Sequence, residues 1–489
     1  MLIRTLARRA AAAATGGALV ATGLLVAAPA PQAHADTVER NAAATWLSKQ
    51  LGTDGLLGGD VAKTIDFALA LDEIGGQQAT VDKIAVGVDA KVNSYAVDGV
   101  SYAQAALFYQ ATGVDPETRA GGLITKLEGA VNDATGEMAY PWGGAWSQAL
   151  AVRALHAAGS DEAAKATGFL VASECPTGGW GYLDGGVCTA DPDDTADMLF
   201  ALFPQQGDSA EIDAAIAAGV AWLKSAQKPS GGFENYGENA SSTGLAAHAL
   251  ALTGADAEAQ KAAVWLSRRQ VAGTACDGKL SGQAGAVPAS DTVLAEGRAG
   301  GIDPAGAGYD WYLATAQSIV ALESVPAAGA LRVSAPAFVH ASTSVKVTAS
   351  GLPTGAYGCV TLAGKSVRVE GASATLAIAV PAGTHRYAAT LSTLGGSKSV
   401  AVQALAAKTL KVSTARRVKA GTKLTVKVTG LAAQERVTVT LGTKKVVRSA
   451  TAAGKVTVKV KVGKKKGMTT VKVRGHFADR KGKATIRVR

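Results

Sequence analysis

The chain of 489 residues is poor in aromatic side chains, which make up only 5% of it. Seven tryptophans are few, and the composition argues against a wide cavity lined by aromatic faces. After the first 35 residues no apolar run is long enough to cross a bilayer, so the sequence predicts no transmembrane segment. The remaining length, about 450 residues, is that of several domains.

Acidic residues are nearly missing from the last part of the chain. Residues 330–489 contain 3 Asp and Glu against 30 Lys and Arg, whereas residues 36–329 contain 36 against 16. The two parts therefore carry net charges of +27 and −20, and the overall charge of +10 describes neither of them. Because the composition changes near residue 330, the sequence predicts two regions that differ in fold and in partners.

The first 35 residues have the pattern of an export signal. Three arginines in the first nine residues precede an apolar run, and residues 33–35 (Ala-His-Ala) match the small-x-small cleavage pattern. The sequence thus predicts a signal peptide over residues 1–35 and a secreted, extracellular mature chain that begins near Asp36.

Residues 36–329 have the pattern of a repeat array. Each copy has a helix with an aromatic-Leu pair, a glycine-rich turn, and a second helix that begins at Thr or Ser and is rich in Ala and Leu. The clearest copy runs from Trp222 through the turn at 231–233 to Thr243. The second helices begin near residues 64, 102, 147, 195, 243 and 315. Since small side chains let helices approach closely, we expect six helix pairs in a closed (α/α)6 ring.

The Trp-Leu, Gln and Gly-Gly-aromatic phrases of residues 40–325 resemble the repeats of the α/α-toroid superfamily. This superfamily includes terpenoid cyclases, protein prenyltransferases, complement-type thioester domains and cobalamin carriers. The resemblance, strongest to squalene-cyclase-like repeats, implies the toroid fold. It implies no single activity, because the fold hosts unrelated functions.

Residues 191–196 (DPDDTA) carry the sharpest functional signal in the chain. They resemble the DxDDTA motif of class II terpene cyclases, whose middle acid protonates an isoprenoid double bond. The resemblance implies that Asp193 would be the general acid and that Asp191 and Asp194 would support it. These three aspartates are the candidate catalytic residues.

The same letters also suit the start of a helix. Asp and Thr side chains accept hydrogen bonds from the free N–H groups of a first helical turn, and we expect a helix that opens at Asp193 and Asp194. Sister copies carry a threonine at the matching place, so we favour this capping interpretation over the catalytic one. The candidate ligand-binding residues of the ring are those at the starts of its second helices: Trp146, Thr195, Thr243 and Thr315.

Zinc and thioester chemistry are not expected. Protein prenyltransferases hold zinc with an Asp-x-Cys pair, and the matching positions here are Asp194 and Ala196, so the thiolate is missing. His248 lies in an apolar helical run and is expected to be an ordinary packed histidine. The sequence has neither a Gly-Cys-Gly-Glu-Gln thioester stretch nor a nucleophile elbow. We expect no metal and no cofactor.

A long Gly-, Ala- and Ser-rich insertion separates Gln270 from Tyr309. Loops of this length are usually functional or disordered. Its place between two helices of the last repeat predicts a lid or binding loop on the same face as residues 191–194.

The four cysteines are consistent with the oxidising compartment that secretion implies, and they allow three pairings. A bridge between Cys175 and Cys188 is favoured, because both flank one loop and a short loop closes at modest entropic cost. Cys276 and Cys359 then remain. They either join the insertion to the first β module or stay free.

Residues 330–489 alternate apolar with polar or basic residues, as half-buried strands do. Clear examples are 345–348, 425–428 and 456–460, and glycines follow at turn spacing. The pattern predicts two β-sandwich modules, 330–407 and 408–489. They resemble bacterial immunoglobulin-like modules.

Residues 408–489 contain 24 Lys and Arg against 2 Asp and Glu. Lysine on edge strands protects sheets from aggregation, but this excess goes far beyond that need. The run Lys464-Lys465-Lys466 concentrates the charge further. We expect these residues to bind a polyanion, and for a secreted chain an anionic cell-wall polymer or anionic lipid headgroups rather than nucleic acid.

Three functions follow from these patterns. The favoured one is a secreted, cell-wall-associated binding protein whose toroid takes a small apolar or isoprenoid-like ligand or a protein. The second is a class II cyclase with Asp193 as its acid, and the third is a structural surface protein without a small-molecule site. The expected fold is an all-α toroid followed by two all-β sandwiches.

Overall fold

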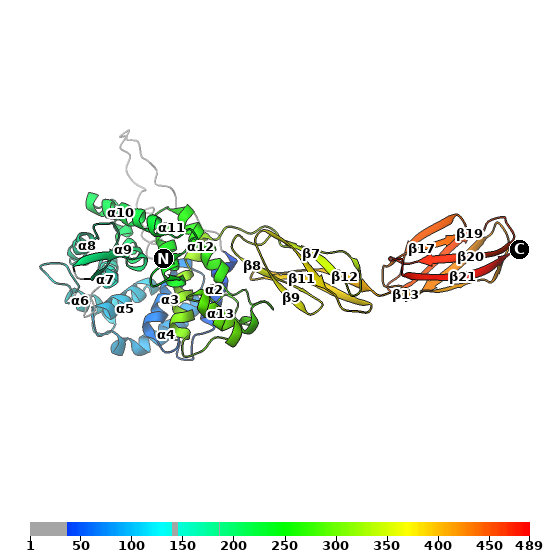
Figure 1. Ribbon diagram of the computed structural model, residues 1–489. Coiled ribbons are helices and arrows are strands. Elements are labelled where there is room, and N and C mark those ends of the chain that lie inside the picture. Colours follow the sequence, from blue (N-terminus) through cyan, green and yellow to red (C-terminus); the bar gives the residue numbers. More distant parts are fainter. Residues whose placement is uncertain (1–36, 139–144, 185) are drawn as a thin grey trace, which may run out of the picture. The chain divides into compact units, whose positions relative to one another are not determined.

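A computed structural model describes residues 37–138, 145–184 and 186–489. The predicted signal peptide therefore lies outside the described residues. The chain divides into two compact units (Figure 1). The helical unit contains the described residues of Met1–Gly329 with Leu352–Gly358 and Thr393–Gly396, and the β unit contains Ala330–Gly351, Cys359–Ser392 and Ser397–Arg489.

The helical unit alternates two sets of helices, as the repeat pattern predicts. We call the second helices of the repeats the inner helices: α3 (Val61–Ile74), α5 (Gly99–Thr112), α7 (Ala145–Ala158), α9 (Pro192–Leu202), α11 (Ala240–Leu252) and α14 (Ala314–Ser318). The other α-helices are α2 (Val38–Ser48), α4 (Gln78–Tyr95), α6 (Leu123–Glu128), α8 (Ala163–Ala172), α10 (Ala210–Ala226), α12 (Asp256–Arg269) and α13 (Asp291–Gly300). Two short hairpins, β1 (Gly181–Asp184) with β2 (Val187–Ala190) and β3 (Phe233–Glu234) with β4 (Glu238–Asn239), precede α9 and α11.

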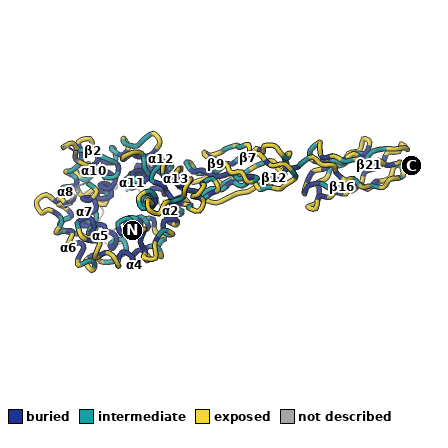
Figure 2. Tube along the Cα trace, turned by 60° about the horizontal axis from the view of Figure 1, so that its bottom comes forward, coloured by how far each residue is buried: buried dark blue, intermediate teal, exposed yellow. Residues whose placement is uncertain are grey.

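The inner helices form a circuit of packing contacts. Each packs on the next in the chain, from α3 through α5, α7, α9 and α11 to α14, and α14 packs back on α3. Inner helices such as α5 and α7 are mostly buried (Figure 2). A Cβ added to Gly244 would lie 2.4 Å from the carbonyl oxygen of Gln317, so the close approach of α11 and α14 requires glycine there.

The insertion after Gln270 is an ordered part of the helical unit rather than a lid. Leu280 and Val287 are fully buried in its core. Asp277, also fully buried, accepts hydrogen bonds from the backbone N–H (2.7 Å) and the hydroxyl (2.9 Å) of Thr274. Such contacts hold the segment against the core, and a mobile lid would lack them.

The insertion also joins the end of the helical unit to its beginning. The side-chain amide of Gln270 donates to the carbonyl oxygen of Glu39 at 2.8 Å, and Trp46 Nε1 donates to Gln283 Oε1 at 2.7 Å. Arg40 pairs with Glu323 nearby, with both side chains almost buried. These contacts fix α2 against the last repeat and complete the packing circuit.

The β unit begins with a three-stranded and a five-stranded sheet, in the orders β10-β7-β5 and β6-β12-β11-β8-β9. Their strands are β5 (Arg332–Ser334), β6 (Phe338–His340), β7 (Ser344–Ser350), β8 (Tyr357–Leu362), β9 (Lys365–Glu370), β10 (Ser373–Ala379), β11 (His385–Thr393) and β12 (Gly396–Leu405). The alternation predicted for residues 345–348 is present in β7, where the buried Val345 and Val347 alternate with more exposed residues.

Residues 408–489 form a second pair of sheets, which we call the basic module. Sheet β14-β16-β19 packs on sheet β13-β21-β20-β17-β18, and β15 also pairs with β21. The strands are β13 (Lys408–Thr409), β14 (Lys411–Thr414), β15 (Arg417–Val418), β16 (Lys423–Thr429), β17 (Arg436–Leu441), β18 (Lys444–Ser449), β19 (Lys455–Lys461), β20 (Gly467–Arg474) and β21 (Arg480–Val488). Inward-facing valines from both sheets share one apolar core.

Candidate functional site

The motif at residues 191–196 begins helix α9, and Asp191 is its N-cap. The Asp191 carboxylate accepts hydrogen bonds from the backbone N–H groups of Asp193 (2.9 Å) and Asp194 (3.0 Å), and Pro192 is the first helical residue. The expectation that the helix opens at Asp193 and Asp194 is therefore wrong by one to two residues. The capping chemistry is present, but Asp191 provides it.

Asp194 and Asp193 reach away from their own helix, to the two neighbouring repeats. Asp194 Oδ1 accepts a hydrogen bond from the backbone N–H of Trp146 (2.9 Å), in the first turn of α7. Asp193 Oδ2 accepts one from the side-chain amide of Asn235 (2.9 Å), which lies between β3 and β4. The other oxygen, Asp193 Oδ1, is buried and has no hydrogen-bond partner among the described residues.

Burial makes both of these carboxyl groups weak acids. It raises the pKa of Asp194 to about 7, and the nearby Asp191 charge adds to the effect. Burial also raises the pKa of Asp193, against the opposing side-chain hydrogen bonds from Ser242 and Asn235. Asp194 is thus partly protonated near neutral pH.

Two further aspartates that sequence reasoning missed lie one helical turn deeper. Asp197 of α9 is only 8% exposed. Burial raises the pKa of Asp197 well above its ordinary value, although Arg153 opposes the shift. Burial likewise raises the pKa of Asp66, on α3, to about 6. We call Asp66, Asp193, Asp194 and Asp197 the inner acidic cluster.

A sequence signal for the two missed residues exists. Asp66 and Asp197 each stand two residues after the threonine at which an inner helix begins, in otherwise apolar helical runs. An acid in the middle of a buried helix conflicts with the core pattern, and such conflicts tend to mark functional sites.

Below the cluster, contacts between side chains link four inner helices. The Arg153 guanidinium lies 5.8 Å from the centre of the Phe200 ring, whose centre is 4.5 Å from that of His248. His248 Nε2 lies 2.8 Å from Glu73 Oε1. Burial alone would raise the pKa of Glu73, but His248 holds it below its ordinary value. His248 packs on Phe200, as the sequence suggests, and it also contacts Glu73, which the sequence does not predict.

The His248–Glu73 contact shows which side of the helices these residues occupy. In the packing circuit, α14 lies between α11 and α3. A direct contact from α11 to α3 therefore passes the inner side of α14. The acidic cluster and the contacts below it consequently face the interior of the circuit.

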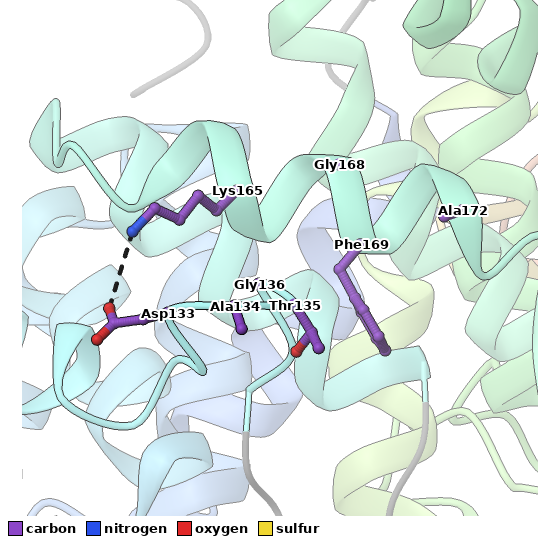
Figure 3. Close-up of a pocket in the computed structure, with 8 residues that line it drawn as sticks. All are labelled: Asp133, Ala134, Thr135, Gly136, Lys165, Gly168, Phe169 and Ala172. Carbon is purple, nitrogen blue, oxygen red and sulfur yellow. Dashed lines mark ion pairs between the residues drawn. The ribbon is translucent and has the colours of Figure 1, made fainter.

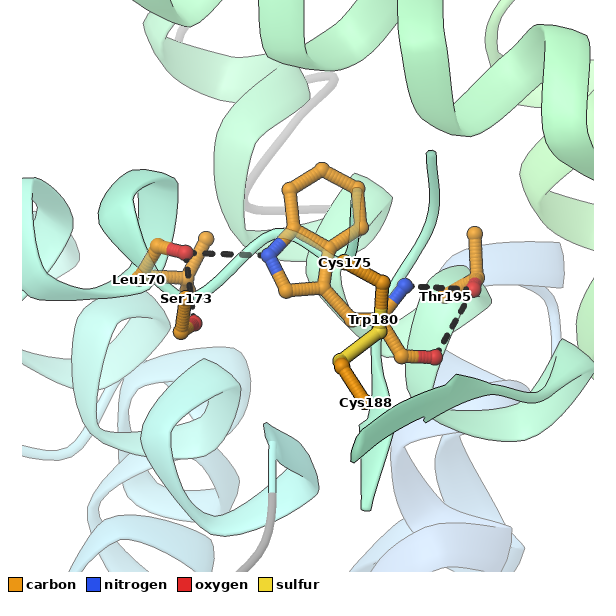
Figure 4. The surroundings of a disulfide bond; sticks show 6 residues. All are labelled: Leu170, Ser173, Cys175, Trp180, Cys188 and Thr195. Atoms are coloured by element: carbon orange, nitrogen blue, oxygen red, sulfur yellow. Dashed lines mark hydrogen bonds between the residues drawn. A yellow bond between two sulfur atoms is a disulfide. The ribbon is translucent and has the colours of Figure 1, made fainter. Parts of the chain in front are cut away.

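The three threonines predicted to bind a ligand have a structural role in this geometry. Thr195 Oγ1 accepts a hydrogen bond from Trp180 N (3.0 Å) and donates to Trp180 O (3.1 Å), as Figure 4 shows. Thr315 likewise accepts from Val287 N and donates to Val287 O, while Thr243 accepts from Phe233 N and donates to Asn239 O. All three are fully buried, so their hydroxyls have no surface left for a ligand. Trp146 keeps 36% of its surface exposed.

The disulfide predicted between Cys175 and Cys188 is confirmed, with the two Cα atoms 5.4 Å apart (Figure 4). It closes the turn and the β1–β2 hairpin that lead into Asp191. Cys276 and Cys359 are also disulfide-bonded, so the alternative in which they stay free is wrong.

A hollow of about 290 Å³ lies between residues 133–136 and helix α8 (Figure 3). Its only charged pair joins Lys165 Nζ to Asp133 Oδ1 across 3.7 Å, and both side chains are exposed. Phe169 adds one apolar wall. None of the candidate residues lines this hollow, and it offers less chemistry than the inner acidic cluster.

Within residues 37–138, 145–184 and 186–489, no three His, Cys, Asp or Glu side chains converge as metal ligands do. In the same ranges, no helix combines the length and apolarity that a bilayer span requires.

No protein-family model matches the chain, and no curated protein does. Among solved structures, a protein from Actinoplanes is 18% identical, with 58% of this chain and 98% of that chain covered and a TM-score of 0.42. The type II terpene cyclase MstE from Scytonema is 17% identical, over 48% of this chain and 63% of its own, with a TM-score of 0.28. The titin I-band fragment I67–I69 is 13% identical over 34% of this chain and 66% of its own, with a TM-score of 0.21.

These likenesses are distant. The packing defines a protein with a helical repeat unit followed by two pairs of β-sheets.

Proposed function

We propose that this chain is a secreted cell-surface protein, held on an anionic cell-wall polymer by its basic module and binding a ligand through its helical unit. In this proposal the helical unit is an (α/α)6 toroid of the terpenoid cyclase and prenyltransferase kind. The closed circuit of six inner helices supports the toroid. The paired cysteines support an extracellular location, since disulfides persist in oxidising compartments.

One observation carries the retention role, namely the outward face of sheet β14-β16-β19. Its residues are only Lys, Thr and Ser: Lys411, Ser413, Lys423, Thr425, Lys427, Thr429, Lys455, Thr457, Lys459 and Lys461. Lys423 stands directly opposite Lys461 in the register of β16 and β19. Like charges placed directly opposite each other are destabilising, and an anionic partner removes that cost.

The second sheet of the basic module repeats this arrangement. Lys472 faces Lys483, and Arg474 faces Lys481, across β20 and β21. The predicted run Lys464–Lys466 is exposed in the turn before β20. The module therefore presents positive charge on both sheets and at this turn, which suits an extended polymer with repeated phosphate groups.

The acidic residues of the module do not neutralise this surface. Glu435 is fully buried and accepts hydrogen bonds from Arg480 Nε (2.7 Å) and Nη2 (2.8 Å). Burial alone would raise the pKa of Glu435, but Arg480 holds it below its ordinary value. Asp479, the other acid, lies 3.8 Å from His340 Nδ1.

The test is binding of the full chain to isolated cell walls at increasing salt. Changing Lys423, Lys459 and Lys461 to Gln should weaken binding at least tenfold, because each lost contact is a screened attraction. A matched control changes three exposed lysines of the helical unit, Lys49, Lys91 and Lys279, to Gln and should leave binding intact. Walls stripped of their phosphate polymer should bind poorly. Equal binding of both triple variants, or binding unchanged in molar salt, would contradict the proposal.

Anionic lipid vesicles separate the polymer from the alternative partner. If the chain binds vesicles but not walls, the polyanion is a lipid surface, and the polymer proposal is wrong. A structural surface protein without a ligand would show wall binding but no ligand binding by its helical unit.

A second candidate is a class II cyclase with Asp193 as general acid. Its support is the buried, unpartnered Asp193 Oδ1 together with the raised pKa of that carboxyl group. Asp193→Asn would then abolish turnover of a squalene-like or diphosphate-bearing isoprenoid while thermal stability stays unchanged. We rank this function lower, because Asp66 and Asp197 add charge where an apolar chain would lie.

A further inference from the structure

The exposed Trp, Tyr and Phe side chains of the described residues occur at one kind of place in the fold. They are Trp146 (36% exposed), Tyr182 (47%), Tyr236 (98%) and Tyr309 (71%). Each lies at the start of an inner helix or in the segment that leads into one: α7, β1 before α9, the turn between β3 and β4 before α11, and Gly308–Leu313 before α14. We call these four residues the aromatic arc.

Hydrogen bonds between neighbouring repeats place the arc on one side of the packing circuit. The backbone N–H of Trp146 donates to Asp194 Oδ1 at 2.9 Å. Asn235, which precedes Tyr236 in the chain, donates to Asp193 Oδ2, also at 2.9 Å. Asp193 and Asp194 both belong to the first turn of α9, so the segments that carry Trp146 and Tyr236 meet at this turn.

A second set of contacts extends the arc to Tyr309. The backbone N–H of Ala240, the first residue of α11, donates to Ala289 O at 2.9 Å, and Ala289 N donates to Asp310 O at 2.7 Å. The Lys63 ammonium group, on α3, lies 4.2 Å from the centre of the Tyr309 ring. The contacts thus run from the start of α7 past α9, α11 and α14 to α3.

Tyr236 has a conformation that packing does not explain. Its backbone φ is +55°, in the left-handed region that costs free energy for a residue with a Cβ. The side-chain amide of Asn239 holds this turn by donating to the carbonyl oxygens of Asn235 (2.9 Å) and Gly237 (3.2 Å). The Tyr236 ring adds nothing to the core, whereas Phe233 in the same hairpin is fully buried. A held turn that presents a bare aromatic ring to solvent suits the binding of a ligand.

We propose that the aromatic arc binds a neutral glycan chain whose sugar rings stack on its aromatic rings. The arc is not one continuous apolar surface, because its rings come from separate repeats and have polar neighbours such as Asn235 and Thr189, which stands opposite Tyr182 across β1 and β2. A sugar ring with equatorial hydroxyl groups has the matching character. Its C–H faces contact the aromatic faces, while the hydroxyl groups at its edge form hydrogen bonds with polar side chains. This rests on the proposed role of the helical unit as the binding module, and it names the class of ligand.

Charge separates this ligand from the polymer that the basic module is proposed to hold. Residues 36–329 carry 16 Lys and Arg against 36 Asp and Glu, a net charge of −20 that repels a chain of phosphate groups. A glycan without charged groups meets no such repulsion. An isoprenoid fits less well, because it would displace water from the polar groups between the rings and offer them no hydrogen bonds.

The test is calorimetric titration of the full chain with the hexasaccharide of β-1,4-linked N-acetylglucosamine and, separately, with cellohexaose. We expect at least one of the two to bind at millimolar concentration or below. Tyr236→Ala should weaken this binding about fivefold or more, because one stacked ring is lost, whereas Tyr236→Phe keeps the ring and should bind nearly as well as the natural chain. Val86→Ala is the matched control, since it removes an exposed apolar side chain from α4, outside the arc, and should change nothing.

The proposal is overturned if neither oligosaccharide binds, or if Tyr236→Ala binds as tightly as the natural chain. Binding of geraniol through Tyr236 without binding of either oligosaccharide would also overturn it, since the arc would then be an apolar site. The Lys423, Lys459 and Lys461 triple variant should bind the oligosaccharide as the natural chain does, and Tyr236→Ala should still bind phosphate-rich walls. Failure of glycan binding therefore leaves the retention role standing, and failure of retention leaves the glycan site standing.

Discussion

In the basic module the lysines stand on the outward faces of both sheets, whereas in the helical unit a cluster of aspartates is turned toward the interior. The exposed lysines remain hydrated, so they cost little and act over a Debye length. The inner aspartates are desolvated, and burial raises the pKa of Asp66 to about 6 and that of Asp194 to about 7. The first arrangement suits long-range attraction of an anionic partner, whereas the second changes the acidity of single carboxyl groups.

The two regions also differ in whether a buried charged side chain has an ion-pair partner. Inside the basic module, Glu435 has its partner in Arg480, with two hydrogen bonds below 3 Å. Inside the helical unit, Asp197 has none among the described residues. A buried charge with its partner is compensated within the fold, while a buried charge that loses its partner destabilises it.

The largest effect should come from breaking the buried pair of the basic module. Arg480→Met leaves Glu435 buried without its cation, and we expect a loss of about 3–5 kcal/mol from the unfolding free energy of the module. Denaturant unfolding followed by circular dichroism measures it. Arg487→Met, on the exposed face of the same strand, should cost little. Equal costs for the two variants would show that Glu435 is not buried as described.

A smaller effect, a gain in stability on protonation, is expected from Asp66 and Asp194 of the helical unit. The folded-state pKa values of Asp66 and Asp194 lie above their ordinary value of 3.8, so the folded state holds protons more tightly than the unfolded state. Their contribution to stability is greatest at low pH and is lost as the pH rises through about 6 to 7.

The melting temperature of the helical unit should therefore rise by a few degrees as the pH falls from about 8 to 5.5. Calorimetry at several pH values measures this slope. In the double variant Asp66→Asn, Asp194→Asn the slope should flatten, and the melting temperature at pH about 8 should increase. A melting temperature that falls with falling pH in the natural chain would contradict the burial of these groups.

Much of this architecture follows from local patterns in the sequence. Helix pairs with Ala-rich second helices and alternating strands such as 456–460 are periodic patterns. Each pattern can be recognised from residues that are close together in the chain. The bridge between Cys175 and Cys188 was predictable for the same reason, since a short loop brings them together. The toroid closure itself remains a proposal.

The candidate site could be predicted only in part. The motif at 191–196 indicated where carboxyl groups would gather, but Asp66 comes from a repeat more than a hundred residues away, and periodicity does not reveal which repeats meet. The contact of Glu73 with His248 depends on the same long-range packing. The role of the threonines could not be predicted either, because a repeated polar residue looks the same in sequence whether it holds a turn or a ligand.

The smallest expected changes in unfolding free energy concern the three aspartates of the motif. They distinguish the residues that stabilise helix starts from one that is available to a ligand or a substrate. Asp191→Ala removes the cap of α9, and Asp194→Ala removes an acceptor from the first turn of α7, so each should cost about 0.5–2 kcal/mol of unfolding free energy. Asp193 caps neither helix, and Asp193→Asn should change stability little. Unfolding in denaturant measures all three on one scale. If Asp193→Asn costs as much as the two alanine variants, the motif is structural throughout, and Asp193 has no oxygen free for a ligand or a substrate.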